Sequence, residues 1–232
     1  MTMTERPLTP AGERILTVAS KLFYERGIKA VGVDLIAEEA GTTKKTLYDR
    51  FGSKDGLVMR YLQRRYQWWC EFVLDHIATL EPGTERILGV YDALDIWMRE
   101  HHRGCGFVNA FAEFGGTDHP ALEVIRAEKA WTRSLFVRLA SEAGFGYPET
   151  LGTQLSLVHE GAVVMSTAGA ARTRSTWPGR SRDLSTACTM PLDEVESVKM
   201  PTERSDTSPE PAPRPTGSSD SAARGQWSCR YG

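Results

Sequence analysis

Apolar residues recur at intervals of three and four along most of the chain, which is the spacing of one face of an α-helix. The first such stripe consists of Ile15, Ala19, Leu22 and Phe23. Gly27 follows the stripe, and glycine often ends a helix because it adopts the left-handed conformation without strain. We therefore predict a helix over residues 11–26.

Two short helices are predicted next. The stripe of the first consists of Val33, Ile36, Ala37 and Ala40, and Gly41 ends it. Thr43 is a suitable N-cap for a second short helix over residues 44–51, in which Leu47 faces inward. Ser53 can cap the helix that follows. Two short helices joined by a glycine-containing turn indicate a helix-turn-helix, whose second helix reads DNA.

Longer amphipathic helices are predicted between residues 58 and 168. The first extends to about residue 77. The next has Thr84 as its N-cap and leaves Ile96 off its apolar face. A further apolar stripe consists of Phe107, Val108, Phe111 and Phe114. The last two helices are expected over residues 122–143 and 150–168.

The composition changes after residue 168. Residues 169–232 hold seven of the twelve prolines, and their only leucine, isoleucine or valine residues are Leu184, Leu192, Val195 and Val198. Such a segment buries too little apolar surface to offset the entropy lost on ordering. We predict an all-α protein with a helix-turn-helix domain at residues 9–57, a second helical domain at residues 58–168 and a disordered tail.

Charge is nearly balanced over the chain but not along it. The formal net charge is -2, which by itself indicates neither a nucleic acid nor a membrane as partner. Residues 43–66, however, carry seven basic side chains against two acidic ones. Cations gathered on one short segment are what phosphate binding requires, although lysine and arginine also occur on ordinary solvated helix faces.

Several classes of protein are not expected. No run of about 18 apolar residues exists to span a membrane, and the polar first ten residues lack the apolar core of a secretory signal. The four cysteines are far apart and form no CxxC pair, so we expect neither a disulfide framework nor a zinc site. The expected compartment is the reducing cytoplasm, and no membrane partner is expected.

The motifs between residues 15 and 57 resemble those of the TetR family of transcriptional regulators. They read AxxLFYERG and DLIAEEAGTTKKTLYDRFGSKDGL, with IAxxAG, TLYxxF and GSKxxL at the spacing of that family. Residues 58–168 resemble the family more weakly, and residues 169–232 do not resemble it. The resemblance implies an all-helical homodimer with three N-terminal helices for DNA and a helical domain for a ligand and dimerisation.

The resemblance also implies roles for individual residues. Lys44, Lys45 and Thr46 would approach base edges in the major groove, while Tyr48 and Lys54 would contact phosphates. The predicted DNA-binding residues are Thr43, Lys44, Lys45, Thr46, Tyr48, Asp49, Arg50 and Lys54. Two of these positions differ from the family pattern, since Arg50 replaces a common histidine and Lys45 a common glycine. The second helix also lacks the usual serine or threonine cap, because Val31, Gly32 and Val33 precede it.

Aromatic side chains are dense in the second domain and suggest a pocket for an apolar or aromatic effector. The candidate lining residues are Trp68, Tyr91, Trp97, Cys105, Phe107, Phe111, Phe114 and Trp131. Ordinary core packing explains the same stripes and stays open as the alternative for each residue. Polar contacts to an effector could come from Asn109, Glu113, His159 and Glu160, which could equally bond other helices.

His101, His102, Cys105 and His119 raise the question of metal or redox chemistry. His101 and His102 point in different directions on a helix, and no other ligand supports them, so we expect no metal and no cofactor. Cys105 follows Gly104 and precedes a predicted helix, whose dipole could lower the pKa of its thiol. A structural or pocket-lining cysteine is the other interpretation.

The family pairs its last two long helices with those of a second subunit. Residues 151–165 fit the first of these helices, but the sequence after Gly169 does not supply the second. We interpret the abrupt change as a reading-frame shift near Gly169, with a native disordered extension as the alternative. In either case the dimer interface is expected to be incomplete.

The leading hypothesis for function is a ligand-responsive homodimeric repressor. The free dimer would bind a palindromic DNA operator, and an unidentified small-molecule effector would shift it to a geometry that releases DNA. The alternative is a helical small-molecule-binding protein with impaired dimerisation and little regulatory activity. We do not expect an enzyme, because no nucleophile–base pair, phosphate-binding loop or pair of carboxylates stands out.

Overall fold

A computed structural model describes residues 8–168 of the chain, and within that range every regular element is an α-helix. The helices are α1 (Pro10–Arg26), α2 (Val33–Glu39), α3 (Lys44–Phe51), α4 (Lys54–Ala78), α5 (Thr84–Glu100), α6 (Gly106–Phe114), α7 (Ala121–Glu142) and α8 (Pro148–Thr167). This confirms the predicted all-α class. The disordered tail, the frame shift and the missing last helix predicted for residues 169–232 lie outside the described residues.

The N-terminal helices begin at side chains that accept backbone hydrogen bonds. The hydroxyl of Thr43 accepts from the N–H of Thr46 at 3.2 Å, and that of Ser53 accepts from the N–H of Gly56 at 2.9 Å. Both predicted N-caps are therefore confirmed, and α2 has no side-chain cap, as predicted. Gly41 turns the chain between α2 and α3 with a φ of 59°, which glycine adopts without strain.

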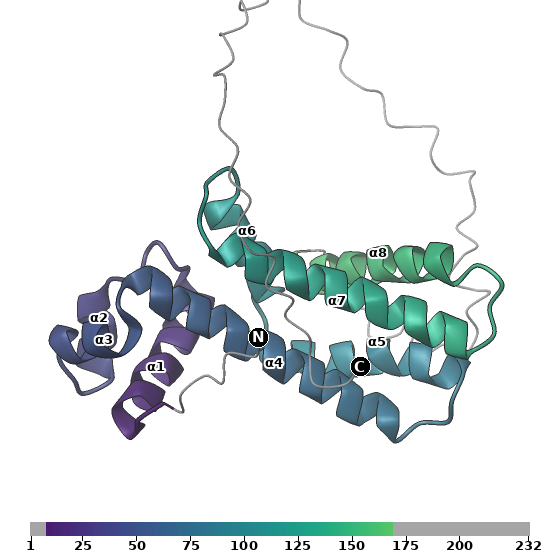
Figure 1. Ribbon diagram of the computed structural model, residues 1–232, viewed down its shortest axis with the longest axis horizontal. Helices are drawn as coiled ribbons and strands as arrows, with labels where there is room; N and C mark the ends of the chain where they lie inside the picture. The colour runs from purple at the N-terminus through teal and green to yellow at the C-terminus, as the bar shows by residue number, and fades with distance from the viewer. Residues whose placement is uncertain (1–7, 169–232) are drawn as a thin grey trace, which may run out of the picture. The chain divides into compact units, whose positions relative to one another are not determined.

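The first three helices surround a small core of their own (Figure 1). Ile15 and Phe23 of α1, Ile36 of α2 and Leu47 of α3 are all buried in it. The first turns of α4 pack against α1 and α3, and α4 then continues away from them into the second group of helices. One helix thus belongs to both parts of the described chain.

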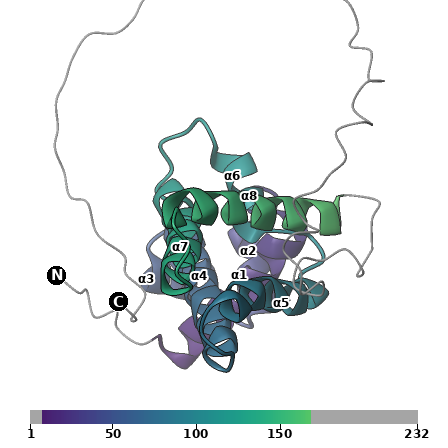
Figure 2. The ribbon, with the colours of Figure 1, turned by 90° about the vertical axis from the view of Figure 1, so that its right-hand side faces the viewer.

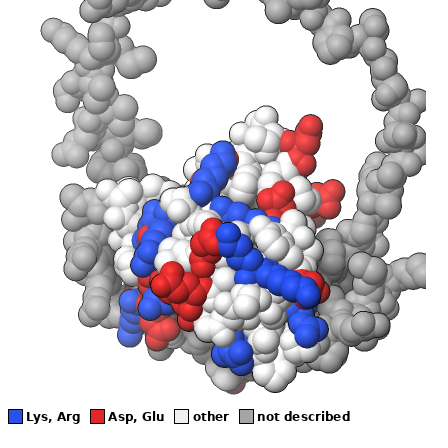
Figure 3. Space-filling view, turned by 90° about the vertical axis from the view of Figure 1, so that its left-hand side faces the viewer, with Lys and Arg blue, Asp and Glu red and all other residues white. Residues whose placement is uncertain are grey.

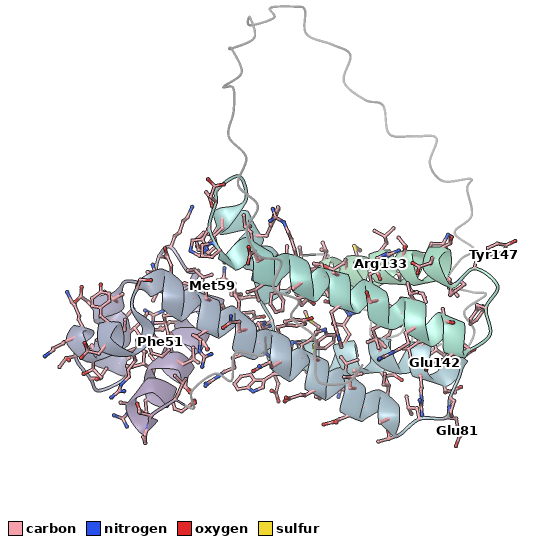
Figure 4. The ribbon with its side chains drawn as sticks, viewed as in Figure 1. Phe51, Met59, Glu81, Arg133, Glu142 and Tyr147 are labelled. Atoms are coloured by element: carbon pink, nitrogen blue, oxygen red, sulfur yellow. The ribbon has the colours of Figure 1, made fainter. Side chains whose placement is uncertain are left out.

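The second core lies between α4, α5, α7 and α8. Tyr91 of α5 and Phe136 of α7 are completely buried at its centre, with ring centroids 5.4 Å apart. Helices α7 and α8 run side by side (Figures 1 and 2), and Arg133 lies between them, donating to Thr153 and Glu149 (Figure 4). Gly152 lets the two helices approach closely, since a Cβ on it would lie 2.7 Å from the Cα of Val137.

One local prediction was wrong. Thr84 is the first residue of α5 rather than its cap, since Gly83 holds the cap position with a φ of 105° and makes no side-chain bond. The apolar stripe of α6 is only half buried, because one face of this short helix packs on α7 and the other faces solvent. Phe107 and Phe114 are buried, whereas Val108 and Phe111 are exposed. Within residues 8–168, no helix is both long and apolar enough to cross a membrane.

Candidate DNA-binding surface and effector cavity

Helix α3 presents a polar face to solvent. Leu47 points into the core, while Lys44, Lys45, Tyr48 and Arg50 are exposed. Asp49 is exposed on the same helix. Phe51, at the end of α3 (Figure 4), is only half buried. Figure 3 shows lysine and arginine side chains spread over this end of the described chain, with acidic side chains between them.

Three of the predicted DNA contacts are engaged with neighbours. The ammonium of Lys44 forms an ion pair with Asp34 of α2. The hydroxyls of Thr43 and Thr46 lie 3.0 Å apart and share a hydrogen bond. The exposed side chains of Lys45 and Tyr48 form no ion pair or hydrogen bond with another side chain within residues 8–168. Lys44 would have to exchange Asp34 for a base or phosphate.

Lys54 stands at the start of α4, next to a contact between the two groups of helices. Burial lowers the pKa of its ammonium, which the carboxylates of Glu113 and Asp55 counteract.

Glu113, near the end of α6, accepts from the backbone N–H of Ile28 at 2.8 Å and of Lys29 at 2.6 Å. Its carboxylate therefore fastens the turn after α1 to α6.

A small cavity opens between α4, α5, α6, α7 and α8, with about 30 Å³ of free space. Its lining residues are Arg65, Trp69, Leu94, Trp97, Met98, Gly104, Cys105, Gly106, Phe107, Glu128, Lys129, His159, Glu160 and Val163. Three of the eight predicted lining residues, Trp97, Cys105 and Phe107, are among them. His159 and Glu160, the expected polar contacts of α8, also line it.

The other five predicted lining residues lie elsewhere. Tyr91 is fully buried in the core, and its hydroxyl donates to the carbonyl of Leu155. Phe114 stacks on His119, and Trp131 packs edge-on against Tyr66. Trp68 and Phe111 are 53% and 50% exposed. The spacing of aromatic residues predicted their helices correctly, but which side faces the cavity depends on how those helices pack.

Charged groups in the cavity come from stripes that otherwise read as apolar. Lys129 donates to Glu160 at 2.7 Å and lies 3.1 Å from a carboxylate oxygen of Glu128. Burial raises the pKa of Glu128. Burial also opposes ionisation of Glu160, but His159 and Lys129 outweigh it and lower its pKa to about 2. The Lys129–Glu160 pair is thus ionised inside the protein.

Sequence reasoning missed Arg65, Glu128 and Lys129. The signal available was a charge within an apolar stripe, since Arg65 falls midway between the buried Tyr61 and Trp69 on α4. Glu128 likewise falls in the buried stripe of α7. A charged side chain at such a position must find a partner or a ligand.

His159 is buried at the cavity, with Nδ1 3.7 Å from a carboxylate oxygen of Glu160. Its ring is 3% exposed and neither ring nitrogen has a hydrogen-bond partner in the described part of the chain. The rings of Trp69, Tyr91 and Phe136 surround it at centroid distances of 5.9 to 6.2 Å. A polar atom of a bound molecule could satisfy a nitrogen that the protein leaves unpaired.

The suggested lowering of the Cys105 pKa was wrong. The thiol is buried, and burial raises its pKa more than the nearby Lys129 lowers it. Among the residues described, no three histidine, cysteine, aspartate or glutamate side chains converge as a metal site would require.

Comparisons with known proteins identify the first part of the chain. A family profile described as "Bacterial regulatory proteins, tetR family" matches residues 15–61. The transcriptional activator FasR of Mycolicibacterium smegmatis is 28% identical over 138 residues, which are 58% of this chain and 63% of that protein. The transcriptional repressor KstR2 of Mycobacterium tuberculosis is 31% identical over 38% of this chain and 44% of its own length. The chain thus spans less than two thirds of these relatives.

Solved structures extend the likeness beyond the helix-turn-helix. A TetR-family transcriptional regulator from Streptomyces coelicolor superimposes with a TM-score of 0.64 and 29% identity, covering 68% of this chain and 84% of that one. A TetR regulator from Streptomyces avermitilis gives a TM-score of 0.61 and 28% identity, covering 77% of this chain and 94% of that one. These matches include helices of the second group as well as the first. Residues 15–61 therefore match the TetR family of bacterial regulatory proteins, and the described chain resembles solved TetR-family transcriptional regulators across both groups of helices.

Proposed function

We propose that the chain is a ligand-responsive homodimeric repressor that acts in the cytoplasm on a palindromic operator. Residues 9–57 would read DNA, and residues 58–168 would bind the effector and dimerise. The observation that carries the proposal is the solvent-facing side of α3, where Lys45, Tyr48 and Arg50 project from the second helix of a helix-turn-helix. Because the relatives named above include both an activator and a repressor, repression is the part that most needs a test.

The exposed side of α8 supports dimerisation. Leu157, Val158, Val164 and Met165 of this helix are all exposed large apolar residues. Apolar side chains gathered on one helix mark a surface that another protein covers. A second copy of the chain related by two-fold symmetry would place two α3 helices on successive half-sites of a palindrome.

The placement of α6 supports a response to an effector. Its first residues, Gly106 and Phe107, line the cavity, and Glu113 near its other end holds the turn after α1. An effector that enters the cavity and displaces α6 would therefore change how the DNA-binding helices are held. A ligand that binds the displaced arrangement more tightly shifts the population away from the DNA-binding one.

Selection of genomic DNA fragments by the purified full-length chain, followed by salt titration of binding, tests the proposal. We expect one palindromic site, bound by an even number of chains. Lys54→Ala should weaken binding to every sequence and reduce the slope of log affinity against log salt by about 0.9. Lys45→Ala should alter the preference among bases, with a cost of about 1–3 kcal/mol at the preferred site.

Arg126→Ala provides the matched control, because it removes an exposed cation from α7, outside the DNA-binding helices. This variant should bind as the wild type does. Binding that is unchanged in the Lys45 and Lys54 variants would contradict the assigned contacts. A monomeric chain that selects no site would instead favour a helical small-molecule-binding protein without regulatory activity. Reporter transcription that falls when the regulator is deleted would contradict repression.

A further inference from the structure

Arg65 of α4 carries a buried charge that the described chain does not neutralise. Its side chain lines the cavity and is 9% exposed. The guanidinium lies over the ring of Tyr24 at 4.6 Å and over that of Trp97 at 5.7 Å. Within residues 8–168, no carboxylate lies within ion-pair distance of it. Cation–π contacts stabilise such a charge, but they do not neutralise it.

Lys129, the other cation of the cavity, shows the contrast. Two carboxylates, Glu128 and Glu160, lie within 3.1 Å of its ammonium. Burial alone would lower its pKa, but these neighbours raise it well above the usual value. A buried charge is costly unless a partner of opposite sign compensates it. Both carboxylates of the cavity thus lie at Lys129, and neither forms an ion pair with Arg65.

The N-terminus of α6 lies against the same guanidinium. The first N–H groups of a helix have no partners within the helix and carry a partial positive charge. Cys105, the residue at the cap position, makes no capping bond with its side chain. Gly106 allows the approach, because a Cβ there would lie 2.7 Å from Nε of Arg65. Two positive groups thus meet at one point, and an anion placed there would interact favourably with both.

We infer that Arg65 and the first turn of α6 bind the carboxylate of a small apolar effector. The inference rests on the proposed function, whose effector it assigns to a chemical class. Trp69, Trp97 and Phe107 supply aromatic walls beside the charge. The planar guanidinium matches a carboxylate with two parallel hydrogen bonds. An acid with an aromatic or aliphatic body fits both the walls and the charge.

The cavity is too small for an organic acid unless the side chains around it move. About 30 Å³ of free space admits little more than water, so an organic acid must push side chains aside. Met98 is a flexible wall residue that can yield. A second pocket of about 260 Å³, lined by Tyr24, Trp68 and His101 among others, lies on another side of Arg65 and offers room for the displaced groups. Entry of the acid at Gly106 would move the start of α6.

Isothermal titration of the full-length protein tests the inference with benzoate, 3-phenylpropanoate and octanoate, each compared with its primary amide. The amide keeps the body of the molecule and removes the charge. We expect at least one carboxylate to bind at least ten-fold more tightly than its amide. Equal affinities for every pair, or no binding by any of the three acids to folded protein, would overturn the inference.

Three variants locate the site. Arg65→Gln should weaken carboxylate binding at least ten-fold, and it should fold because it removes an uncompensated buried charge. Gly106→Ala should weaken binding as well, since the added methyl group occupies the space at the α6 N-terminus. Arg126→Gln, on the surface of α7, should bind as the wild type does. Full carboxylate affinity in the folded Arg65→Gln protein would place the anion elsewhere and overturn the inference.

DNA binding, measured separately, distinguishes this inference from the proposed function. Carboxylate binding by a chain that selects no operator would contradict the regulator and leave the anion site intact. Operator binding without carboxylate binding would contradict the anion site and leave the proposed regulator intact. If both hold, the acid should release the operator from the wild type at concentrations that leave the Arg65→Gln complex intact.

Discussion

Replacing Glu113 by glutamine removes half of the contact that holds the turn after α1 to α6. The two carboxylate oxygens accept from two successive N–H groups, those of Ile28 and Lys29. Glutamine offers one carbonyl oxygen and turns an NH₂ group towards the other donor. One hydrogen bond is therefore replaced by two donors that face each other.

The magnitude follows from the kind of bond that is lost. A hydrogen bond to a charged group contributes about 1.5–3 kcal/mol. The bond to Lys29 is exposed, and water can replace it there, so the cost lies near the lower end. We expect the free energy of unfolding to fall by about 1.5 kcal/mol. For a protein of this length, that fall corresponds to a melting temperature about 3–6 °C lower.

Circular dichroism during heating and during urea titration measures the loss. Glu71→Gln is the control, because it makes the same chemical change at an exposed position of α4. Hydrogen exchange gives a local readout, since the amides of Ile28 and Lys29 should exchange faster in the Glu113 variant. A melting temperature equal to that of the control, with unchanged exchange at these two amides, would refute the assignment of this contact.

Three further substitutions test other parts of the structure. Thr43→Ala removes the cap of α3 and should cost about 1 kcal/mol in urea unfolding, whereas Thr43→Ser should be near neutral. Gly152→Ala should cost about 1–3 kcal/mol because its methyl group meets the backbone of Val137, while Gly161→Ala, with open space around it, should not destabilise. Glu128→Gln tests pH dependence. The pKa of Glu128 is raised in the native state, so above about pH 4.3 the native state binds more protons than the unfolded state. The free energy of unfolding of the wild type should therefore fall as the pH rises from there. The glutamine variant should lose that part of the pH dependence, and identical pH profiles would contradict the assigned shift.

The sequence by itself determined the helices and which side chains of α3 face solvent. Thr43 caps α3 by accepting from the N–H three residues later, and Gly41 supplies a turn between two neighbouring helices. Leu47 is buried and Lys45 exposed because a helix separates its faces by spacing alone. Such features depend on atoms within a few residues of one another, and the order of residues already places those atoms together.

The cavity was decided only by the tertiary structure. Arg65, Gly106 and Glu128 come from three helices, and nothing in their local sequence says that they share one space. The same limit explains Phe111, which was predicted at the cavity but is exposed, and Glu113, whose two possible roles the sequence left open and which bonds the turn after α1. Residue spacing shows which side chains share one face of a helix, but it does not show which other helix or cavity that face meets. The packing angles of α4 to α8 decide which side chain meets a cavity, because burial depends on the combined surface of elements far apart in the chain.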